Sequence, residues 1–421
     1  MFKFIHAADI HLDSPCLGLE QYEGAPVQAL RAATRAAISN LIDLAVTEEV
    51  EFVLIAGDLY DGDWRDYNTG LFMTAQMARL QKAGIRVFIV AGNHDAASRI
   101  TRHLSFPDNV YVFPVKKPKS IVLPELRAVI HGQGFESRTE TEDLAAGFPA
   151  PQFGSFNIGL LHTSLDGRAG HATYAPTTLE VLVSKGYDYW ALGHVHKREV
   201  ISEMPWIVFP GNLQGRHARE TGPKGATLVR VENNMVVDAT HHDLDDVRWE
   251  ECGIDASAAA GGEEVMDSVR NVLEAAAGNA ENRVLAVRIR LTGTSQAHAE
   301  LSRDWEKWLN QIRACGLEAG DKIWIEKVLL QTSSPMDLNA VADLDNPVGG
   351  LVRTLRGLKG DEASLRELMD TLFQDLKRAL PAEYFSQEEV IDPRNPAVAG
   401  SLVREVEQLL IPRLLNAEER S

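Results

Sequence analysis

Cysteine is scarce in this sequence: the chain of 421 residues holds three, Cys16, Cys252 and Cys315, and they lie far apart. Without a C-x-x-C pair, a disulfide scaffold and a cysteine zinc ribbon are both excluded. Long apolar runs are missing too, since no stretch approaches the ~18 uninterrupted apolar residues of a membrane helix. The chain reaches Asp9 before any such run, so we expect no secretory signal and a cytoplasmic location.

A basic excess is also absent, because 42 lysines and arginines stand against 60 acidic residues, for a formal net charge of −18. This balance argues against a protein that simply coats nucleic acid. It does not exclude an enzyme that acts on nucleic acid, because bound cations can invert the local sign of the charge. A hydrophobic content of 45% is ordinary for a folded protein and excludes wholesale disorder.

Histidine is nearly absent from the second part of the chain. Of the 13 histidines, His298 alone follows residue 250. Histidine is a versatile metal ligand and proton shuttle near neutral pH, so we expect the chemistry in the first 250 residues. The length predicts two or three domains at roughly 150 residues each, and we place the first at residues 1–250.

Short apolar segments alternate with helical patterns in residues 1–250. The periodicity predicts helices over 26–48 and 70–82, and strands over 2–7, 52–56, 87–91, 121–130, 156–161, 189–192, 206–209, 226–231 and 235–240. The fold class is therefore α/β, a layered domain whose sheets carry helices on their outer faces. In such sheets, ligands bind beyond the carboxyl ends of the strands.

The remaining residues form two further parts. Helical patterns at 263–277 and 301–314 alternate with strands at 284–291 and 323–331, which indicates a small α+β module at residues 251–340. Residues 337–350 are rich in Asp, Asn, Gly and Pro and are predicted to be a linker. A helical region at 341–421 follows, with apolar spacing over 365–380 and 402–410. We expect Pro412 to kink or end the last helix.

Asp, Asn and His side chains recur at the carboxyl ends of five predicted strands. This set supplies three oxygen and four imidazole donors: Asp9, His11, Asp58, Asn93, His162, His194 and His196. Seven ligands are too many for one tetrahedral zinc ion and suit two cations about 3.5–4 Å apart that share a carboxylate. Oxygen and imidazole donors without thiolate favour Mn²⁺, Fe or Zn²⁺ over Ca²⁺ or Mg²⁺, and we expect Mn²⁺.

Each short motif carries little information alone. A D-x-H triplet occurs often by chance, and G-N-H-D is rich in turn-forming residues. The G-H-x-H pair is stronger, since side chains two apart on an extended strand point the same way. The remaining histidines are predicted to be packing, surface or supporting residues: His6, His103, His131, His171, His217, His241, His242 and His298.

Taken in order, the motifs resemble those of the calcineurin-like metallophosphoesterases: D-x-H, G-D-x-x-D, G-N-H-D, a lone His and G-H-x-H. The stretches HAADIHLDSP from His6, GNHDAASR up to Arg99 and FPGNLQGR up to Arg216 are similar to the SbcD-like DNA repair exonucleases, and among them to the YhaO-type branch. The resemblance covers about residues 1–245 and is weak beyond. It implies a layered β-sandwich flanked by helices.

The resemblance also implies roles for individual residues. One metal would be held by Asp9, His11, Asp58 and His196, and the other by Asp58, Asn93, His162 and His194, with Asp58 bridging. His94 matches the proton donor of the family, and Asp61 matches the carboxylate that orients it. Some repair nucleases of this branch have His at the position of Asp61, which leaves the substrate preference open. An adjacent carboxylate favours the imidazolium form that an acid catalyst needs.

By the same resemblance, we expect a DNA exonuclease, with endonuclease activity left open, that uses water activated by two divalent metal ions. Arg99 and Arg216 are candidates for contacts with substrate phosphates, against the plainer interpretation of a solvated surface. Residues 251–340 would form a capping module that selects DNA ends. The helices of 341–421 would dock an SbcC-like coiled-coil ATPase, pack within the chain, or form a homodimer contact. Two alternatives stay open: a phosphoesterase for cyclic nucleotides or phosphomonoesters, and a non-catalytic scaffold of the same fold.

Overall fold

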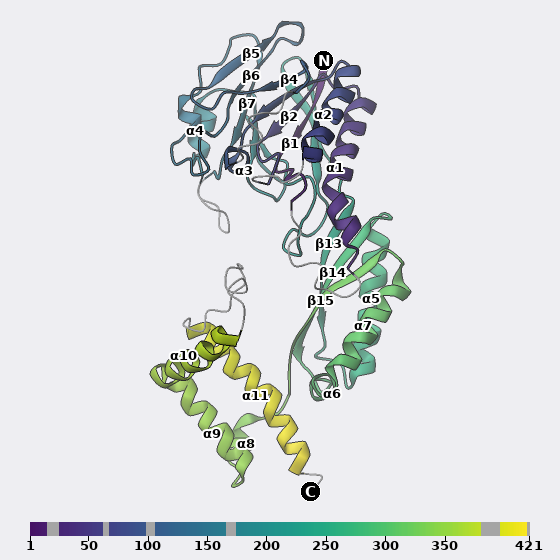
Figure 1. Ribbon diagram of the computed structural model, residues 1–421, viewed down its shortest axis with the longest axis vertical. Coiled ribbons are helices and arrows are strands. Elements are labelled where there is room, and N and C mark those ends of the chain that lie inside the picture. Colours follow the sequence, from purple (N-terminus) through teal and green to yellow (C-terminus); the bar gives the residue numbers. More distant parts are fainter. Residues whose placement is uncertain (15–24, 62–66, 98–105, 166–173, 380–395, 419–421) are drawn as a thin grey trace. The chain divides into compact units, whose positions relative to one another are not determined.

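The computed structural model describes residues 1–14, 25–61, 67–97, 106–165, 174–379 and 396–418 (Figure 1). The chain divides into two compact units. The first comprises Met1–Glu251, Ala276–Arg288 and Gly320–Glu326, and the second comprises Cys252–Ala275, Ile289–Ala319 and Lys327–Ser421. Among the described residues, no helix combines the length and the apolar character that crossing a membrane requires.

Two six-stranded sheets form the body of the first unit. The first sheet has the order β12 (Met235–Asp243), β11 (Gly225–Glu232), β1 (Phe2–Ala7), β2 (Phe52–Ala56), β3 (Arg86–Val90), β4 (Val110–Val112). The second has the order β5 (Lys119–Leu123), β6 (Ala128–Gln133), β7 (Phe156–His162), β8 (Tyr189–Gly193), β10 (Trp206–Phe209), β9 (Glu199–Glu203). Strands β1 to β4 run parallel, as do β6, β7, β8 and β10.

The alternation of side chains along these strands explains why the sheets stack. On β2, Phe52 and Leu54 belong to a core that also contains Phe156 and Tyr189 of the second sheet, so this core lies between the sheets. The intervening Val53 belongs to a different core, which the first sheet shares with helices. Strands buried on both faces have continuous apolar sequences, as the sequences of β2 and β3 do.

Helices cover the outer faces of the two sheets, which confirms the predicted layered α/β architecture. Helices α1 (Val27–Thr47) and α2 (Tyr67–Lys82) lie together beside the first sheet in Figure 1 and share a core with β1 to β3. Helix α4 (Leu179–Ser184) packs on the second sheet, with Leu182 in contact with the core around Trp190. The short helix α3 (Asn93–Ala97) follows β3 directly.

A three-stranded sheet follows, with the order β13 (Val247–Asp255), β14 (Val284–Thr294) and β15 (Ile323–Ser333). The helices α5 (Gly262–Asn279), α6 (His298–Arg303) and α7 (Trp305–Ala319) alternate with these strands. The chain then forms α8 (Leu338–Ala342), α9 (Pro347–Gly360), α10 (Glu362–Ala379) and α11 (Pro396–Glu418). The three-part division at residues 250 and 340 stays a prediction.

Three local predictions are wrong. The strand expected over 121–130 is two antiparallel strands, β5 and β6, because the chain turns at Pro124–Leu126 and Arg127 adopts a φ of 51°. The expected linker at 337–350 contains α8 and the start of α9, whose N-caps are Asp337 and Asn346. Asp and Asn are therefore frequent there because they accept hydrogen bonds from the first turns of helices.

The helix expected over 301–314 is divided at Asp304, which leaves the helical conformation with a φ of −131° and separates α6 from α7. Helix α11 continues beyond Pro412 to Glu418, so that proline does not end it, and the kink expected as the alternative stays a prediction. The strands β4, β9 and β13 and the helices α3 and α4 are additions that the sequence patterns do not predict.

Candidate metal centre

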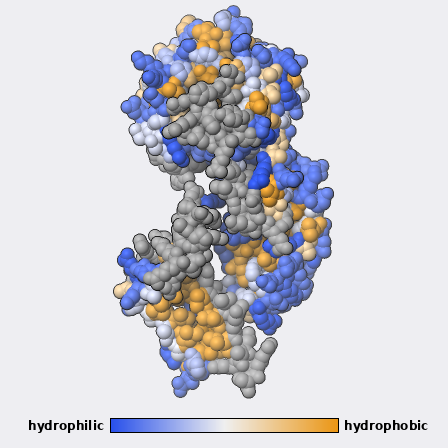
Figure 2. Space-filling view, in the orientation of Figure 1, coloured by the Kyte–Doolittle hydropathy of each residue, from blue (hydrophilic) through white to orange (hydrophobic). Residues whose placement is uncertain are grey.

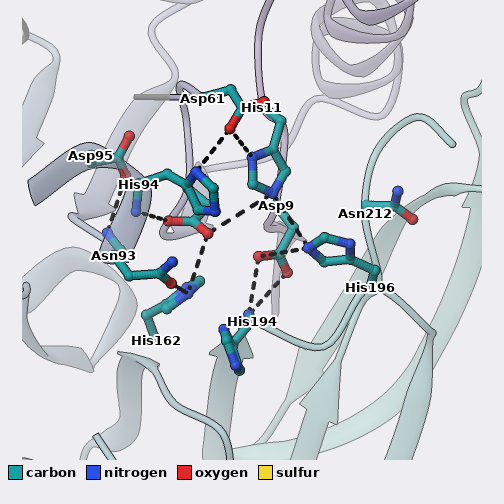
Figure 3. A network of polar contacts seen from close by, with 12 residues as sticks. Asp9, His11, Asp61, Asn93, His94, Asp95, His162, His194, His196 and Asn212 are labelled. Atoms are coloured by element: carbon teal, nitrogen blue, oxygen red, sulfur yellow. Dashed lines mark hydrogen bonds and ion pairs between the residues drawn. The ribbon is translucent and has the colours of Figure 1, made fainter. Parts of the chain in front are cut away.

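The predicted ligand residues lie directly after β1, β2, β3 and β8, and His162 is the last residue of β7. Because the strands run parallel, the loops that follow them gather at one edge of the two sheets. The loops after β1 and β2 are hydrogen bonded to one another: Asp9 N donates to Gly57 O at 3.1 Å and His11 N to Asp58 O at 3.0 Å. Side chains that are far apart in the sequence therefore meet in one cluster (Figure 3).

Several of these residues have an unusual backbone conformation. The φ angles are 49° at Asp9, 47° at His11, 51° at Asp58 and 105° at His194. A positive φ is unfavourable for residues with a side chain, and such strain tends to concentrate at functional sites. The surrounding structure holds these turns in place, and it thereby points the side chains beyond the ends of the strands.

Two glycines allow the close approach of the strands beneath the cluster. A Cβ atom at Gly193 would lie 1.8 Å from the carbonyl oxygen of Ala56, and one at Gly57 would lie 2.4 Å from His162 Nδ1. Gly57 also has a φ of 93°, which side chains other than glycine rarely tolerate. The G-D and G-H pairs of the motifs therefore have a steric cause.

One group of ligand atoms comes from Asp9, His11 and His196, whose atoms lie within 4.8 Å of one another. His196 Nδ1 donates to Glu220 Oε1 at 2.6 Å, so its Nε2 carries a lone pair when the ring is neutral. That Nε2 lies 3.3 Å from His11 Nε2. Burial lowers the pKa of His11 to about 4, which keeps its ring neutral near pH 7, and the Asp61 carboxylate 3.8 Å away favours the proton on Nδ1.

A second group comes from Asp9, Asp58 and His162. His162 Nδ1 donates to the Ala56 carbonyl at 2.9 Å, and burial lowers the pKa of the ring to about 3, so Nε2 carries a lone pair. Nevertheless, Nε2 lies 3.0 Å from Asn93 Oδ1 and 3.5 Å from Asp58 Oδ2. An imidazole nitrogen, an amide oxygen and a carboxylate oxygen thus converge, and each of these atoms can bind a divalent cation. The donor set therefore fits a divalent metal ion.

Asp58 and Asp9 lie between these groups. Asp58 is 2% exposed and accepts a hydrogen bond from His94 N at 2.9 Å. It belongs to the group with Asp9 and His162 and to a third group with His11 and His94. Burial raises the pKa of Asp9 to about 7, with the negative charge of Asp58 acting in the same direction. Two neighbouring buried carboxylates are costly without a positive partner, which again fits cations at the site.

His94 and Asp61 form an ion pair at the edge of the cluster, with 2.8 Å between His94 Nδ1 and Asp61 Oδ1. The hydrogen bond from His94 to Asp61 raises the pKa of His94. Burial tends to raise the pKa of Asp61, but its contacts with His11 and His94 outweigh burial and hold it well below the usual range. The His94 side chain is 31% exposed, whereas those of His11 and His162 are fully buried, so His94 is open to a substrate.

His194 and Arg216 are two further predicted site residues that the structure describes. The backbone N–H of His194 donates to both Asp9 oxygens at 3.1 and 3.0 Å. Its ring lies edge-on to His162, with centroids 5.2 Å apart, and points away from Asp9 in Figure 3. Within the described part of the chain, none of the candidate ligand groups includes His194. Arg216 lies at the rim of the cluster, and Arg99 lies outside the described residues.

Sequence reasoning missed three residues that support the cluster. Glu220 accepts the hydrogen bond from His196, and Asn212, shown in Figure 3, donates to Glu220 Oε2 at 3.0 Å. Asp95 accepts hydrogen bonds from the backbone of Gly92, Leu59 and Tyr60 and ties the loops after β2 and β3 together. The G-N-H-D motif contains Asp95, whereas no sequence pattern marks Glu220.

Of the histidines predicted to be supporting residues, His6, His131 and His298 are buried and hydrogen bonded away from the cluster. His6 contacts the Tyr189 hydroxyl and the Leu192 carbonyl, His131 contacts Ser120 and Asn157, and His298 contacts Thr332. His217 lies 3.7 Å from Glu220 Oε1. His103 and His171 lie outside the described residues.

The chain is similar to known proteins over most of its length. Residues 2–198 match the family described as Calcineurin-like phosphoesterase, and residues 249–333 match the family described as Metallophosphoesterase YhaO, middle domain. The "Uncharacterized metallophosphoesterase YhaO" of Bacillus subtilis is 33% identical over 407 residues, which cover 94% of this chain and 95% of that protein.

More distant relatives cover the first part of the chain. The "DNA double-strand break repair protein Mre11" of Sulfurisphaera tokodaii is 24% identical over 263 residues, 55% of this chain and 60% of that protein. The protein of the same name from Saccharolobus solfataricus is 27% identical over 47% of this chain and 50% of its own length. A solved dimetal phosphatase from Danio rerio is 14% identical over 54% of this chain and 92% of its own, with a TM-score of 0.32, too low to support an argument.

Proposed function

Because the chain belongs to the YhaO family of calcineurin-like metallophosphoesterases, we propose that it is a two-metal phosphodiesterase that degrades DNA from its ends. The observation that carries this proposal is the convergence of His162 Nε2, Asn93 Oδ1 and Asp58 Oδ2 in one buried cluster. The choice of DNA as substrate draws on the distant Mre11 relatives, whose name refers to DNA double-strand break repair. Endonuclease activity is left to the test.

In this proposal, one cation would be held by Asp9, His11, Asp58 and His196, and the other by Asp58, Asn93 and His162. His194, the remaining predicted ligand, would join the second cation only with its ring turned from the orientation in Figure 3. Two divalent cations at such a centre activate water near neutral pH and neutralise the charge that grows on the phosphoryl oxygens. Mn²⁺ is the metal we propose, because the donors are oxygen and imidazole without thiolate.

His94 would be the general acid. Asp61 holds its Nδ1 at 2.8 Å and favours the imidazolium, so the proton on Nε2 is available to the departing nucleotide oxygen. The exposed fraction of this side chain, 31%, is consistent with contact with a substrate. Arg216, at the rim, and Arg99 are the proposed phosphate contacts. No covalent enzyme intermediate is required.

The test is an assay with linear duplex DNA, with Mn²⁺ and with EDTA. We expect DNA degradation that depends on Mn²⁺ and is about 10²- to 10⁴-fold slower in His94→Ala, while His242→Ala, on β12 outside the cluster, retains activity. Endonuclease activity would appear as nicking of circular DNA. Cleavage restricted to cyclic nucleotides or nitrophenyl esters would replace DNA with a small-molecule substrate. If the protein hydrolyses none of these substrates but still binds a partner, the scaffold alternative is favoured.

We also propose that the C-terminal helices dock an SbcC-like coiled-coil ATPase in the cytoplasm, and that residues 251–340 form a capping module that selects DNA ends. Apolar side chains on α10 and α11 are exposed, and Figure 2 has apolar surface over this helical region. They are Leu368, Leu372, Val406, Leu410 and Leu414. An acidic nuclease with a net charge of −18 would gain DNA affinity from such a partner.

Copurification with an SbcC-like ATPase tests this docking proposal. We expect Leu368→Ser/Leu372→Ser to lose the ATPase, while Leu317→Ser on α7, where the leucine is 71% exposed, retains it. Light scattering of the isolated chain is the second measurement. If the double variant converts a dimer to a monomer and no ATPase binds, the helices contact a second copy instead.

A further inference from the structure

Glu220 is a carboxylate beside the candidate metal centre that accepts four hydrogen bonds. It lies in the loop between β10 and β11 and is 7% exposed. Its Oε1 accepts from His196 Nδ1 at 2.6 Å and from Arg216 Nη2 at 3.3 Å. Its Oε2 accepts from Asn212 Nδ2 at 3.0 Å and from the backbone N–H of Arg216 at 2.7 Å. Both oxygens are therefore fully engaged.

The contact with His196 fixes more than the position of the ring. A carboxylate can only accept, so the proton of the neutral imidazole is held on Nδ1 and the lone pair on Nε2. That Nε2 faces His11 Nε2 at 3.3 Å and lies 4.0 Å from Asp9 Oδ1. Glu220 thereby presents His196 to the cluster in the tautomer that can bind a cation.

The contacts with Arg216 extend the network across the rim. The Arg216 guanidinium lies 3.3 Å from Glu220 Oε1 and 3.6 Å from Asp61 Oδ2. Asp61 in turn holds His94 at 2.8 Å. A continuous series of charged contacts thus joins His196 to His94, and in this series Arg216 is held between two carboxylates.

We propose that Glu220 is a positioning residue of this centre, which sets the tautomer of His196 and anchors Arg216 against Asp61. The inference rests on the proposed metal-dependent phosphodiesterase, because His196 matters only if it binds a cation. Carboxylates behind metal-binding histidines usually contribute about 10- to 100-fold to metal affinity. Glu220 and His196 are 24 residues apart in the sequence, and the path of the loop brings them into contact.

The opposing interpretation is that Glu220 only holds its own loop together. The loop has other anchors, since Gln214 Nε2 donates to Val247 O, Trp249 Nε1 donates to Gly215 O at 3.0 Å, and Gly222 N donates to Trp249 O at 2.9 Å. These contacts with β13 do not involve Glu220. We therefore expect the loop to keep its path when the carboxylate is removed.

The test compares Glu220→Ala and Glu220→Gln with Glu203→Ala, which removes an exposed carboxylate on β9. Nitrogen NMR of the metal-free protein reports the tautomer of His196. The signals of His196 are assigned by their absence from the spectrum of His196→Gln. Calorimetric titration with Mn²⁺ reports the affinity. We expect the wild type and Glu203→Ala to hold the Nδ1–H tautomer, and Glu220→Ala to shift to Nε2–H and bind Mn²⁺ about 10- to 100-fold more weakly.

Glu220→Gln keeps the shape of the side chain and decides the matter if the alanine variant does not fold. It loses at least two accepted hydrogen bonds, so we expect weaker Mn²⁺ binding than in the wild type. The inference is overturned if folded variants keep the wild-type tautomer and the wild-type Mn²⁺ affinity. Neither the tautomer measurement nor the Mn²⁺ titration uses DNA. If both change as expected but DNA is not cleaved, the role of Glu220 stands and only the proposed substrate is wrong.

Discussion

Replacement of His94 tests the proposed acid in a way that depends on the leaving group. His94 Nδ1 is bound to Asp61 Oδ1 at 2.8 Å, so Nε2 is the nitrogen left to protonate a substrate oxygen. Removing a general acid typically costs about 10²- to 10⁴-fold in rate. We expect a loss of that size for His94→Ala on DNA, because the deoxyribose oxygen is a poor leaving group without a proton.

A nitrophenyl ester of a nucleotide provides the internal comparison, since nitrophenolate leaves readily without protonation. On this substrate we expect His94→Ala to retain most of the activity. Asp61→Asn keeps the imidazole but loses a charged hydrogen bond worth about 1.5–3 kcal/mol, which corresponds to about a 10- to 100-fold smaller rate on DNA. Single-turnover rates with both substrates measure these effects. Equal losses of His94→Ala on DNA and on the ester would refute the assignment of His94 as the acid.

Three further predictions concern stability and metal binding. Gly193→Ala would place a Cβ 1.8 Å from the carbonyl oxygen of Ala56. We therefore expect it to lower the free energy of unfolding, measured in urea, by more than about 1 kcal/mol and to weaken Mn²⁺ binding. Gly253→Ala is the control, because the space around Gly253 is open and we expect neither effect. Burial lowers the pKa of His6 to about 3, so the unfolded state binds the extra proton between about pH 6.5 and 3. The free energy of unfolding should fall as the pH drops through this range. In His6→Gln it should fall less steeply, with a slope that is smaller by about 1.4 kcal/mol per pH unit, as measured in urea titrations. Mn²⁺ at about a hundredfold its dissociation constant should stabilise the protein by about 2.7 kcal/mol per site, and EDTA should abolish the increase in melting temperature; no increase with Mn²⁺ would contradict the centre.

The sequence predicts the parallel strands β2, β3 and β8 well, because they are buried, largely apolar and end in a polar turn, whereas it misses β4 and merges β6 with β5. This pattern locates strands β1 to β3 and the residues that follow them, and Asp9, Asp58 and His162 do meet. The roles of these residues in metal binding stay predictions. The α/β class and the family resemblance are confirmed.

Other features depend on tertiary structure and leave no local pattern. Nothing in the local sequence indicates that Glu220 contacts His196, because the path of a long loop brings them together. The position of Arg216 between Glu220 and Asp61 has the same origin. The caps Asp337 and Asn346 fall in a segment whose composition predicts a linker, because the same residue types favour turns and helix starts.

The most direct test of the central claim is an anomalous diffraction map of crystals grown with Mn²⁺. We expect two peaks about 3.5–4 Å apart, one beside His11 and His196 and the other beside Asn93 and His162, with Asp58 between them. A single peak, or metal bound away from these side chains, would contradict that claim.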